Sequence, residues 1–170
     1  MDKMAVEIRP LAGEEIGLLE QHVAFGPPEK HRERFARQRK GTVVYLVAWR
    51  ENLPVGHALL KWDGSTDEPM ASELDSCPDT EDLFVSPDHR SRGIGSQLMD
   101  AVENLTRQQG YSRVGLGVGV ENVRAHSLYE RRGYEASGFG EYRERGCYVD
   151  RDGREQSWEE DCIYLIKQLR

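Results

Sequence analysis

The sequence has 170 residues, a length that suits one domain and excludes two of full size. Hydrophobic residues make up 38% of it and charged residues 31%, so a well-patterned core needs no disulfide or metal. The net charge of −7 disfavours a protein that clamps duplex nucleic acid, because such proteins are normally basic.

The N-terminal half of the chain predicts a strand, two helices and a hairpin. A short strand is expected at 4–8 and helices at 11–25 and 29–40, divided by a Gly-Pro-Pro break. The β-branched and aromatic residues of 42–50 and 53–62 predict a hairpin, and the composition of 63–78 predicts a loop. We expect the basic residues of the second helix to form a solvated face: Lys30, Arg32, Arg34, Arg37, Arg39 and Lys40.

The C-terminal half alternates strands and helices before a final hairpin. Strands are expected at 79–85 and 111–120, each followed by a helix, at 95–109 and 122–132. Two last strands, at 135–149 and 161–169, are joined by a turn. The resulting fold is a mixed α/β sheet, with a parallel βαβ unit at its centre and antiparallel hairpins beside it. No linker or repeat appears, which predicts a single domain over residues 1–170.

Acidic residues are concentrated in residues 62–88, which contain nine of the 30 and no Lys or Arg. The remaining 21 acidic residues face 23 basic ones, so this stretch accounts for the negative net charge. It is either a solvated loop or a surface that attracts a cationic partner. Its members are Asp63, Asp67, Glu68, Glu73, Asp75, Asp79, Glu81, Asp82 and Asp88.

The three cysteines, Cys77, Cys147 and Cys162, are widely spaced and form no CxxC or Cys/His ligand pattern. We therefore expect neither a metal site nor a secreted disulfide framework. No apolar run approaches the length that spans a membrane, and residues 1–10 lack an apolar signal core. A reduced, cytoplasmic protein without a membrane partner is the expectation.

Residues 81–96 run from a strand through a polar turn into a helix. The start of a helix presents unpaired backbone N–H groups and the positive end of its dipole. Gly93 and Gly95 leave room for an anion, and Arg90 and Arg92 add positive charge. The segment therefore predicts a phosphate or pyrophosphate site. It lacks the GxxxxGK(S/T) pattern of the ATP and GTP phosphate loop.

The strand at 114–120 alternates apolar residues with Gly115, Gly117 and Gly119. These glycines do not form GxGxxG before a helix, which weakens a dinucleotide-binding interpretation. A bare glycine face permits close approach of either a flat, extended group or a packed helix.

Two segments resemble the GNAT superfamily of N-acetyltransferases. The acyl-CoA loop of that family has Arg or Gln, two residues, Gly, one residue, and Gly or Ala, as in Arg90-Ser-Arg-Gly93-Ile-Gly95. The segment Asn122-Val-Arg-Ala-His-Ser-Leu-Tyr129, followed by Gly133-Tyr134, is similar to a later motif of the family. The motifs lie in the family's order, and the expected elements match the GNAT fold over nearly the whole chain.

The resemblance implies acetyl-CoA as the acyl donor and no metal. Backbone groups of Phe84 and Val85 would pair with the pantetheine arm, and Asn122 would bond it while also capping its helix. Tyr129 matches the family's frequent general acid, which protonates the CoA thiolate. The pyrophosphate would lie on the turn formed by Arg90, Ser91, Arg92, Gly93, Ile94, Gly95 and Ser96.

A base is also needed, because an alkylamine with a pKa near about 10 is protonated at neutral pH. Family members often use a carboxylate on the strand before the CoA loop, which makes Glu81 the first candidate, Asp82 the second and Asp79 the third. Strand alternation would put Glu81 and Asp82 on opposite faces, so only one can point into the site. These acids could instead bind a cationic amine or lie on the surface. His57, His126 and Cys77 are minor candidates.

The expected activity is acetyl transfer from acetyl-CoA to a primary amine of a cationic small-molecule or peptide acceptor. The amine would attack the thioester directly in a ternary complex. Two alternatives stay open: a non-catalytic acyl-CoA-binding or sensing domain of the same fold, and a nucleotide-binding protein that uses residues 90–96. The acceptor is not identified by any motif. Homodimers are common in the family, but this sequence carries no sign of one.

Overall fold

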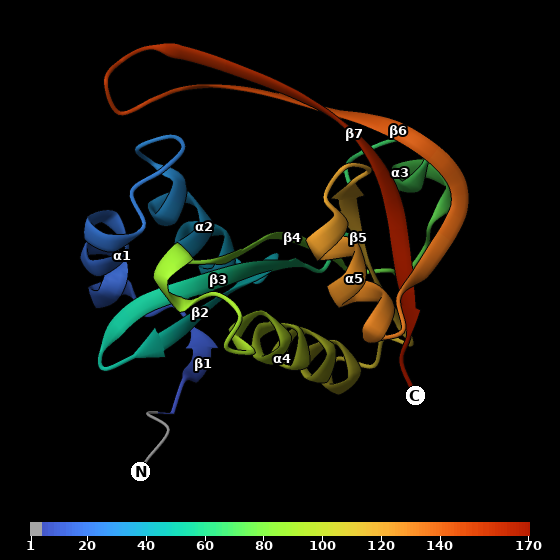
Figure 1. The fold of residues 1–170 in the computed structure, drawn as a ribbon, viewed down its shortest axis with the longest axis horizontal. Coiled ribbons are helices and arrows are strands. Elements are labelled where there is room, and N and C mark those ends of the chain that lie inside the picture. Colours follow the sequence, from blue (N-terminus) through green and yellow to red (C-terminus); the bar gives the residue numbers. More distant parts are fainter. Residues whose placement is uncertain (1–4) are drawn as a thin grey trace.

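In the computed structural model, which describes residues 5–170, one seven-stranded sheet runs through the molecule (Figure 1). Its order is β1-β2-β3-β4-β5-β7-β6, and only β4 and β5 are parallel. This confirms the mixed, mostly antiparallel α/β sheet with a central parallel βαβ unit. The strands are β1 (Glu7–Pro10), β2 (Val43–Arg50), β3 (Leu53–Lys61), β4 (Asp79–Val85), β5 (Arg113–Gly119), β6 (Glu135–Val149) and β7 (Glu155–Gln168).

Helices differ from the expected ranges mainly in the N-terminal region and the acidic loop. The first predicted helix is limited to a 3-10 turn and α1, and the predicted loop contains the short α3. No helix in the described part of the chain is long and apolar enough to cross a bilayer. The helical elements are η1 (Gly13–Glu15), α1 (Ile16–His22), α2 (Lys30–Arg39), α3 (Met70–Glu73), η2 (Pro87–His89), α4 (Ile94–Gln108) and α5 (Val123–Arg131).

Two predicted strand boundaries were wrong. The first strand ends at Pro10 as expected, with Pro10 paired to Leu46, but it begins at Glu7, and residue 4 of the predicted strand lies outside the described residues. The last strand begins at Glu155 rather than at residue 161. Its first seven residues are all exposed, so they show no alternation of apolar and polar side chains, and only their pairing with β6 defines them as a strand.

The sheet has an apolar cluster on each face. Leu98 and Val102 of α4 pack with Leu60 of β3 and Leu116 of β5, which joins the two sides of the central βαβ unit. The opposite face of β2 and β3 is covered by α1 and α2, in a second cluster composed of Leu11, Leu19, Val43, Tyr45, Val47, Trp49 and Leu59. The apolar stripe predicted for the helix at 95–109 is confirmed by this packing.

The glycine face of β5 is occupied by side chains from β6 and β7. A Cβ at Gly115 would collide with the ring of Tyr164, and one at Gly117 would collide with Tyr142 and Glu144. The expectation that a helix or an extended group approaches these glycines was therefore wrong. The close approach is made instead by neighbouring side chains of the same sheet.

β4 and β5 are joined only at their beginnings. Their register contains two pairs, Asp79 with Gly115 and Thr80 with Leu116. Beyond Thr80 the two strands separate, so backbone groups of residues 81–85 have no partner strand on the β5 side. We call this region the β4–β5 divergence (residues 81–85 of β4).

The β6–β7 hairpin is long and extends beyond the rest of the sheet. Figure 1 shows it arching from the C-terminal side of the molecule towards α1 and α2. Near its turn, Arg151 forms an ion pair with Glu20 of α1, with 2.7 Å between Nη1 and Oε2. The hairpin is thus attached at both ends, by strand pairing at its base and by this ion pair at its tip.

Candidate active site

The turn between β4 and α4 is held by contacts to both neighbouring elements. Arg90 donates through Nε to the carbonyl oxygen of Val85 at 2.9 Å, and Arg124 of α5 donates to Oγ of Ser91 at 3.0 Å. Ser91 and Gly93 have positive φ angles of 61° and 81°. These left-handed residues turn the chain sharply into α4, which favours glycine at the second position.

The free amides of this turn lie at the start of α4, one residue earlier than predicted. α4 begins at Ile94, so the N–H groups of Ile94, Gly95 and Ser96 have no partner within the helix. The side chain of Ile94 is buried in the core, and only its backbone is available to a ligand. Arg92 is exposed beside them. The residues predicted to bind pyrophosphate therefore form one continuous, positively charged turn.

The other predicted cofactor residues come from the two elements around the β4–β5 divergence. Phe84 and Val85 end β4, beyond its last pair with β5. Asn122 caps α5, where its Oδ1 accepts from the Ala125 N–H at 3.2 Å. The predicted cap is confirmed, and the side-chain NH₂ of Asn122 makes no protein hydrogen bond within residues 5–170.

Tyr129 lies on α5 with its ring against that of Tyr134, at 5.6 Å between centroids. Burial raises the pKa of the Tyr129 phenol to about 12. The hydroxyl therefore keeps its proton at neutral pH and can donate it.

Glu81 and Asp79 share Lys61 but have different environments. Lys61 Nζ lies 2.8 Å from Glu81 Oε1 and 3.8 Å from Asp79 Oδ2. Asp79 is buried and accepts from the Tyr164 hydroxyl at 2.9 Å. Burial, together with the charge of Glu81, raises the pKa of Asp79 well above its usual range. Glu81 is the more accessible carboxylate, with 42% of its side chain exposed.

Asp82 is held by two basic residues of α2. Lys30 Nζ and Arg34 Nη2 each lie 2.9 Å from its Oδ2. Burial alone would raise the pKa of Asp82, but the neighbouring His57, Arg34 and Lys30 outweigh it and hold the pKa below its usual range. The expectation of a solvated basic face was wrong for Lys30 and Arg34, whose side chains are only 9% and 15% exposed.

A bulge changes which face Asp82 occupies. Between Glu81 and Phe84, β4 has one residue more than the paired segment of β3. Strand alternation is therefore interrupted, and Glu81 and Asp82 contact Lys61 and α2 on the same side of the sheet. The prediction that only one of them can point to this side was wrong.

The minor candidates all have internal environments or partners. Burial lowers the pKa of His57 to about 3, and its Nδ1 donates to the Asp82 carbonyl at 3.0 Å. His126 Nε2 lies 3.2 Å from the Gly119 carbonyl oxygen. Cys77 is buried, which raises the pKa of its thiol to about 11. These environments favour structural roles over nucleophilic ones.

A model of the acetyltransferase (GNAT) family matches residues 15–134, more than half of the chain. The protein belongs to the GNAT family. A 93-residue segment is 40% identical to an uncharacterised N-acetyltransferase of Methanocaldococcus jannaschii, covering 54% of this chain and 38% of that protein. The aligned part is therefore well under two thirds of this relative.

Solved structures confirm the GNAT fold over almost the full length. An N-acetyltransferase of Staphylococcus aureus Mu50 superposes with a TM-score of 0.71 at 16% identity, covering 98% of this chain and 99% of the other. PaiA N-acetyltransferase of Thermoplasma acidophilum, solved in complex with coenzyme A, has a TM-score of 0.64 at 15% identity, covering 97% and 99%. At these identities the likeness establishes the fold alone.

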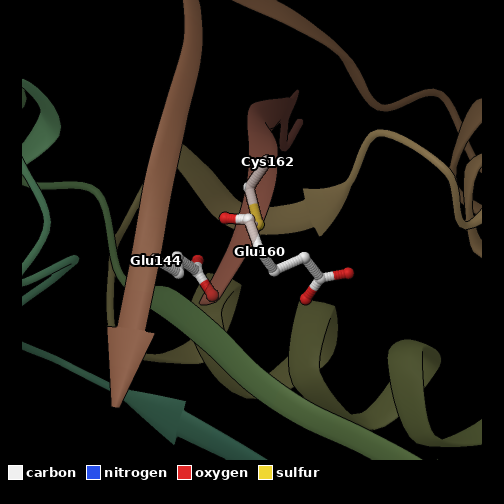
Figure 2. Close-up of side chains that lie close together, drawn as sticks. All are labelled: Glu144, Glu160 and Cys162. Atoms are coloured by element: carbon white, nitrogen blue, oxygen red, sulfur yellow. The ribbon is translucent and has the colours of Figure 1, made fainter. Parts of the chain in front are cut away.

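This GNAT protein also brings together acidic side chains of β6 and β7 that were not predicted from the sequence. Figure 2 shows Glu144 of β6 beside Glu160 and Cys162 of β7. One oxygen or sulfur atom of each residue lies within 4.8 Å of the others. The β6–β7 register, in which Glu144 pairs with Glu160, brings them together. Alternation along the predicted strand 135–149 was the available signal, but the register could not be predicted from it.

Residues of the predicted acidic loop and of β4 extend this cluster. Burial raises the pKa of Glu144, and the charges of Asp67, Glu81 and Glu160 raise it further. Burial and nearby carboxylates also raise the pKa of the Cys162 thiol to about 12, so it carries no charge. We call Asp67, Glu81, Glu144 and Glu160 the acidic cluster.

The acidic cluster has little positive charge to balance it. Within residues 5–170, no Lys or Arg forms an ion pair with Asp67, Glu144 or Glu160, and Lys61 alone pairs with Glu81. By contrast, Arg143 on β6 pairs with both acidic neighbours of Glu160. Carboxylates close together attract a cation. The cluster is therefore suited to a positively charged ligand.

Proposed function

We propose that this protein transfers an acetyl group from acetyl-CoA to a primary amine of a cationic acceptor, in a ternary complex. The observation that carries the proposal is the β4–β5 divergence, which contains Glu81 of the acidic cluster and leads into the positively charged turn before α4. Leu83 and Val85 of the same segment pack in the apolar cluster that includes Tyr129. The coenzyme A complex of the Thermoplasma relative supports the choice of donor. We place the reaction in the cytoplasm because the three cysteines are free.

The donor would bind along the end of β4 and the start of α4. Amides of Ile94, Gly95 and Ser96 would receive the pyrophosphate, and Arg92 would add charge. The backbone groups of Phe84 and Val85 that β3 and Arg90 leave free would bond the pantetheine arm in the manner of an added strand. The free NH₂ of Asn122 would donate to the same arm from the α5 side.

The acceptor amine would lose a proton and then attack the thioester carbon. Glu81 would take this proton directly or through a water molecule, since it is the accessible carboxylate next to the divergence. A new N–C bond forms, and a backbone N–H polarises the carbonyl oxygen. The C–S bond then breaks, and Tyr129 donates its proton to the leaving thiolate. The second proton of the attacking nitrogen, released as the amide forms, would pass through solvent to the Tyr129 oxygen and restore the phenol.

The charge of the acidic cluster supports a cationic acceptor. Asp67, Glu144 and Glu160 lie on the Glu81 side of the site without a basic partner among the described residues. An amine that carries positive charge would be concentrated there and held while Glu81 removes one proton. Small molecules and peptides can both meet this requirement.

The test is acetyl-CoA-dependent release of CoA with a panel of primary amines and Glu81→Gln as the variant. The substitution should lower kcat by about 10²-fold to 10⁴-fold and leave the Kd of acetyl-CoA unchanged, because it removes only the base. Glu135→Gln, on exposed β6, is the matched control. Full activity of Glu81→Gln would contradict the base assignment.

The two alternatives predict different results for ligand binding and for turnover. Binding of acetyl-CoA without turnover on any amine would favour a sensing domain. Thermal stabilisation by ATP but not by acetyl-CoA would favour a nucleotide-binding protein.

A further inference from the structure

The β4 bulge requires an unusual backbone conformation at Asp82. Its φ of 53° lies in the left-handed region, which costs a non-glycine residue free energy. Of the five non-glycine residues with positive φ among residues 5–170, Asp82 alone lies within a strand. Such a conformation persists only where its surroundings hold it.

Both the side chain and the backbone of Asp82 are held. Lys30 and Arg34 pair with the same carboxylate oxygen, Oδ2. The carbonyl oxygen accepts from Nδ1 of His57, which is buried and packed against the ring of Phe84 at 5.2 Å between centroids. α2 and β3 thus fix the residue from two directions.

The same contacts reach the residues that end β4. Lys30 Nζ lies 3.7 Å from the centroid of the Phe25 ring, and Phe25 packs on Phe84 at 4.7 Å between centroids. Asp82 directly precedes residues 83–85, which lie in the β4–β5 divergence. A change of φ at Asp82 would therefore rotate the peptide groups proposed to bond the donor.

We propose that Lys30 and Arg34 are positioning residues that hold Asp82 in its left-handed conformation and thereby aim the backbone of residues 83–85 at acetyl-CoA. This inference rests on the proposed donor site. It gives Asp82 a positioning role in place of the catalytic-base role considered from the sequence. It also gives the buried side chains of Lys30 and Arg34 a function in donor binding.

The first test compares Asp82→Gly with Asp82→Ala. Both substitutions remove the carboxylate and leave Lys30 and Arg34 without it, but only glycine adopts a positive φ at little cost. The glycine variant should retain about tenfold more kcat/KM for acetyl-CoA than the alanine variant. Equal losses in the two variants would overturn the proposal, and total inactivity of both would indicate that the Asp82 carboxylate acts chemically.

The second test removes the positive charges of Lys30 and Arg34. Lys30→Met/Arg34→Met should lower kcat/KM for acetyl-CoA by roughly tenfold and leave the acceptor KM unchanged. Adding Asp82→Gly should recover most of this loss, whereas adding Asp82→Ala should not. Arg32→Met/Arg39→Met, at exposed positions of α2, is the matched control with the same charge change.

A second readout separates failure of this inference from failure of the proposed activity. The Kd of acetyl-CoA, measured by calorimetry on the same variants, should follow the same order without any acceptor. If the wild-type protein acetylates no amine yet glycine still restores the Kd, the positioning role stands and the activity fails. If glycine and alanine variants bind acetyl-CoA equally, the positioning role fails. The single Asp82 variants keep the test valid if the double α2 variant does not fold.

Discussion

At the scale of single residues, different environments distinguish the proposed proton donor from the proposed proton acceptor. Tyr129 is buried, and this keeps its phenol protonated, while Glu81 is partly exposed beside Lys61. Asp79 and Asp82, close to Glu81 in sequence, are each engaged in internal contacts. Position in the sequence alone could not distinguish these three acids, because their differences come from partners on β3, β7 and α2.

Tyr129→Phe should lower kcat with little change in the Kd of acetyl-CoA. The substitution keeps the ring packing against Tyr134 and removes only the hydroxyl that is proposed to protonate the leaving thiolate. We expect a loss of about 10²-fold in kcat, measured by CoA release. Because the pKa of Tyr129 is about 12, the wild-type rate should show no decline from its ionisation between pH 7 and about pH 10. Unchanged kcat in the phenylalanine variant would rule out the proposed donor.

Contiguous motifs were predicted well, and features that depend on strand pairing were not. The turn at 90–96 and the Asn122 cap depend on neighbouring residues, and both were found from the sequence. The bulge at Asp82 depends on how β3 and β4 pair, and the meeting of Glu144 with Glu160 depends on the register of β6 and β7. Such pairings are set by tertiary packing, which local patterns do not contain.

At the scale of elements, the β6–β7 hairpin links the acidic cluster to α1. Glu144 and Glu160 lie on the hairpin, and Arg151 at its turn pairs with Glu20. The residues beyond position 144 are mostly exposed, so few packing contacts hold the outer hairpin. The ion pair is therefore expected to restrict the motion of an element that carries the charge proposed to bind the acceptor.

Arg151→Gln should raise the acceptor KM by about twofold to fivefold, in keeping with the modest free energy of a partly exposed ion pair. The change should leave the KM of acetyl-CoA unaltered, because the donor residues lie on β4, α4 and α5. Amide hydrogen exchange at 145–159 should become faster. The exchanged pair Arg151→Glu/Glu20→Arg should reverse both effects, and no recovery would contradict a role for this contact.

At the scale of the whole molecule, charge is divided between the two sides of the β4–β5 divergence. The turn before α4 carries Arg90 and Arg92, whereas the opposite side carries the acidic cluster. From the sequence, residues 62–88 could be either a solvated loop or a surface that attracts a cationic partner. In the structure that stretch contributes Asp67 and Glu81, and the other charged members come from β6 and β7.

Neutralising the cluster should weaken acceptor binding and its dependence on salt. Glu144→Gln/Glu160→Gln is expected to raise the acceptor KM by roughly tenfold at low ionic strength and less at high ionic strength, since screening already weakens the attraction there. Glu135→Gln/Glu155→Gln changes the net charge equally on the same strands and serves as the control. Steady-state kinetics over a range of NaCl concentrations measures the acceptor KM and its dependence on salt. If the two double variants behave alike, the acceptor responds to net charge and not to this cluster.

The short register between β4 and β5 also bears on the mechanics of the sheet. β4 and β5 share only two residue pairs. The sheet therefore has two hydrogen-bonded halves, β1 to β4 and β5 to β6, joined mainly by the apolar cluster under α4 and α5. A donor that bonds the backbone on the β4 side and a side chain on the α5 side would link the two halves of the sheet. Transfer of the acetyl group leaves the hydrogen bonds of CoA to both halves intact. The two halves of the sheet would therefore stay linked until CoA dissociates.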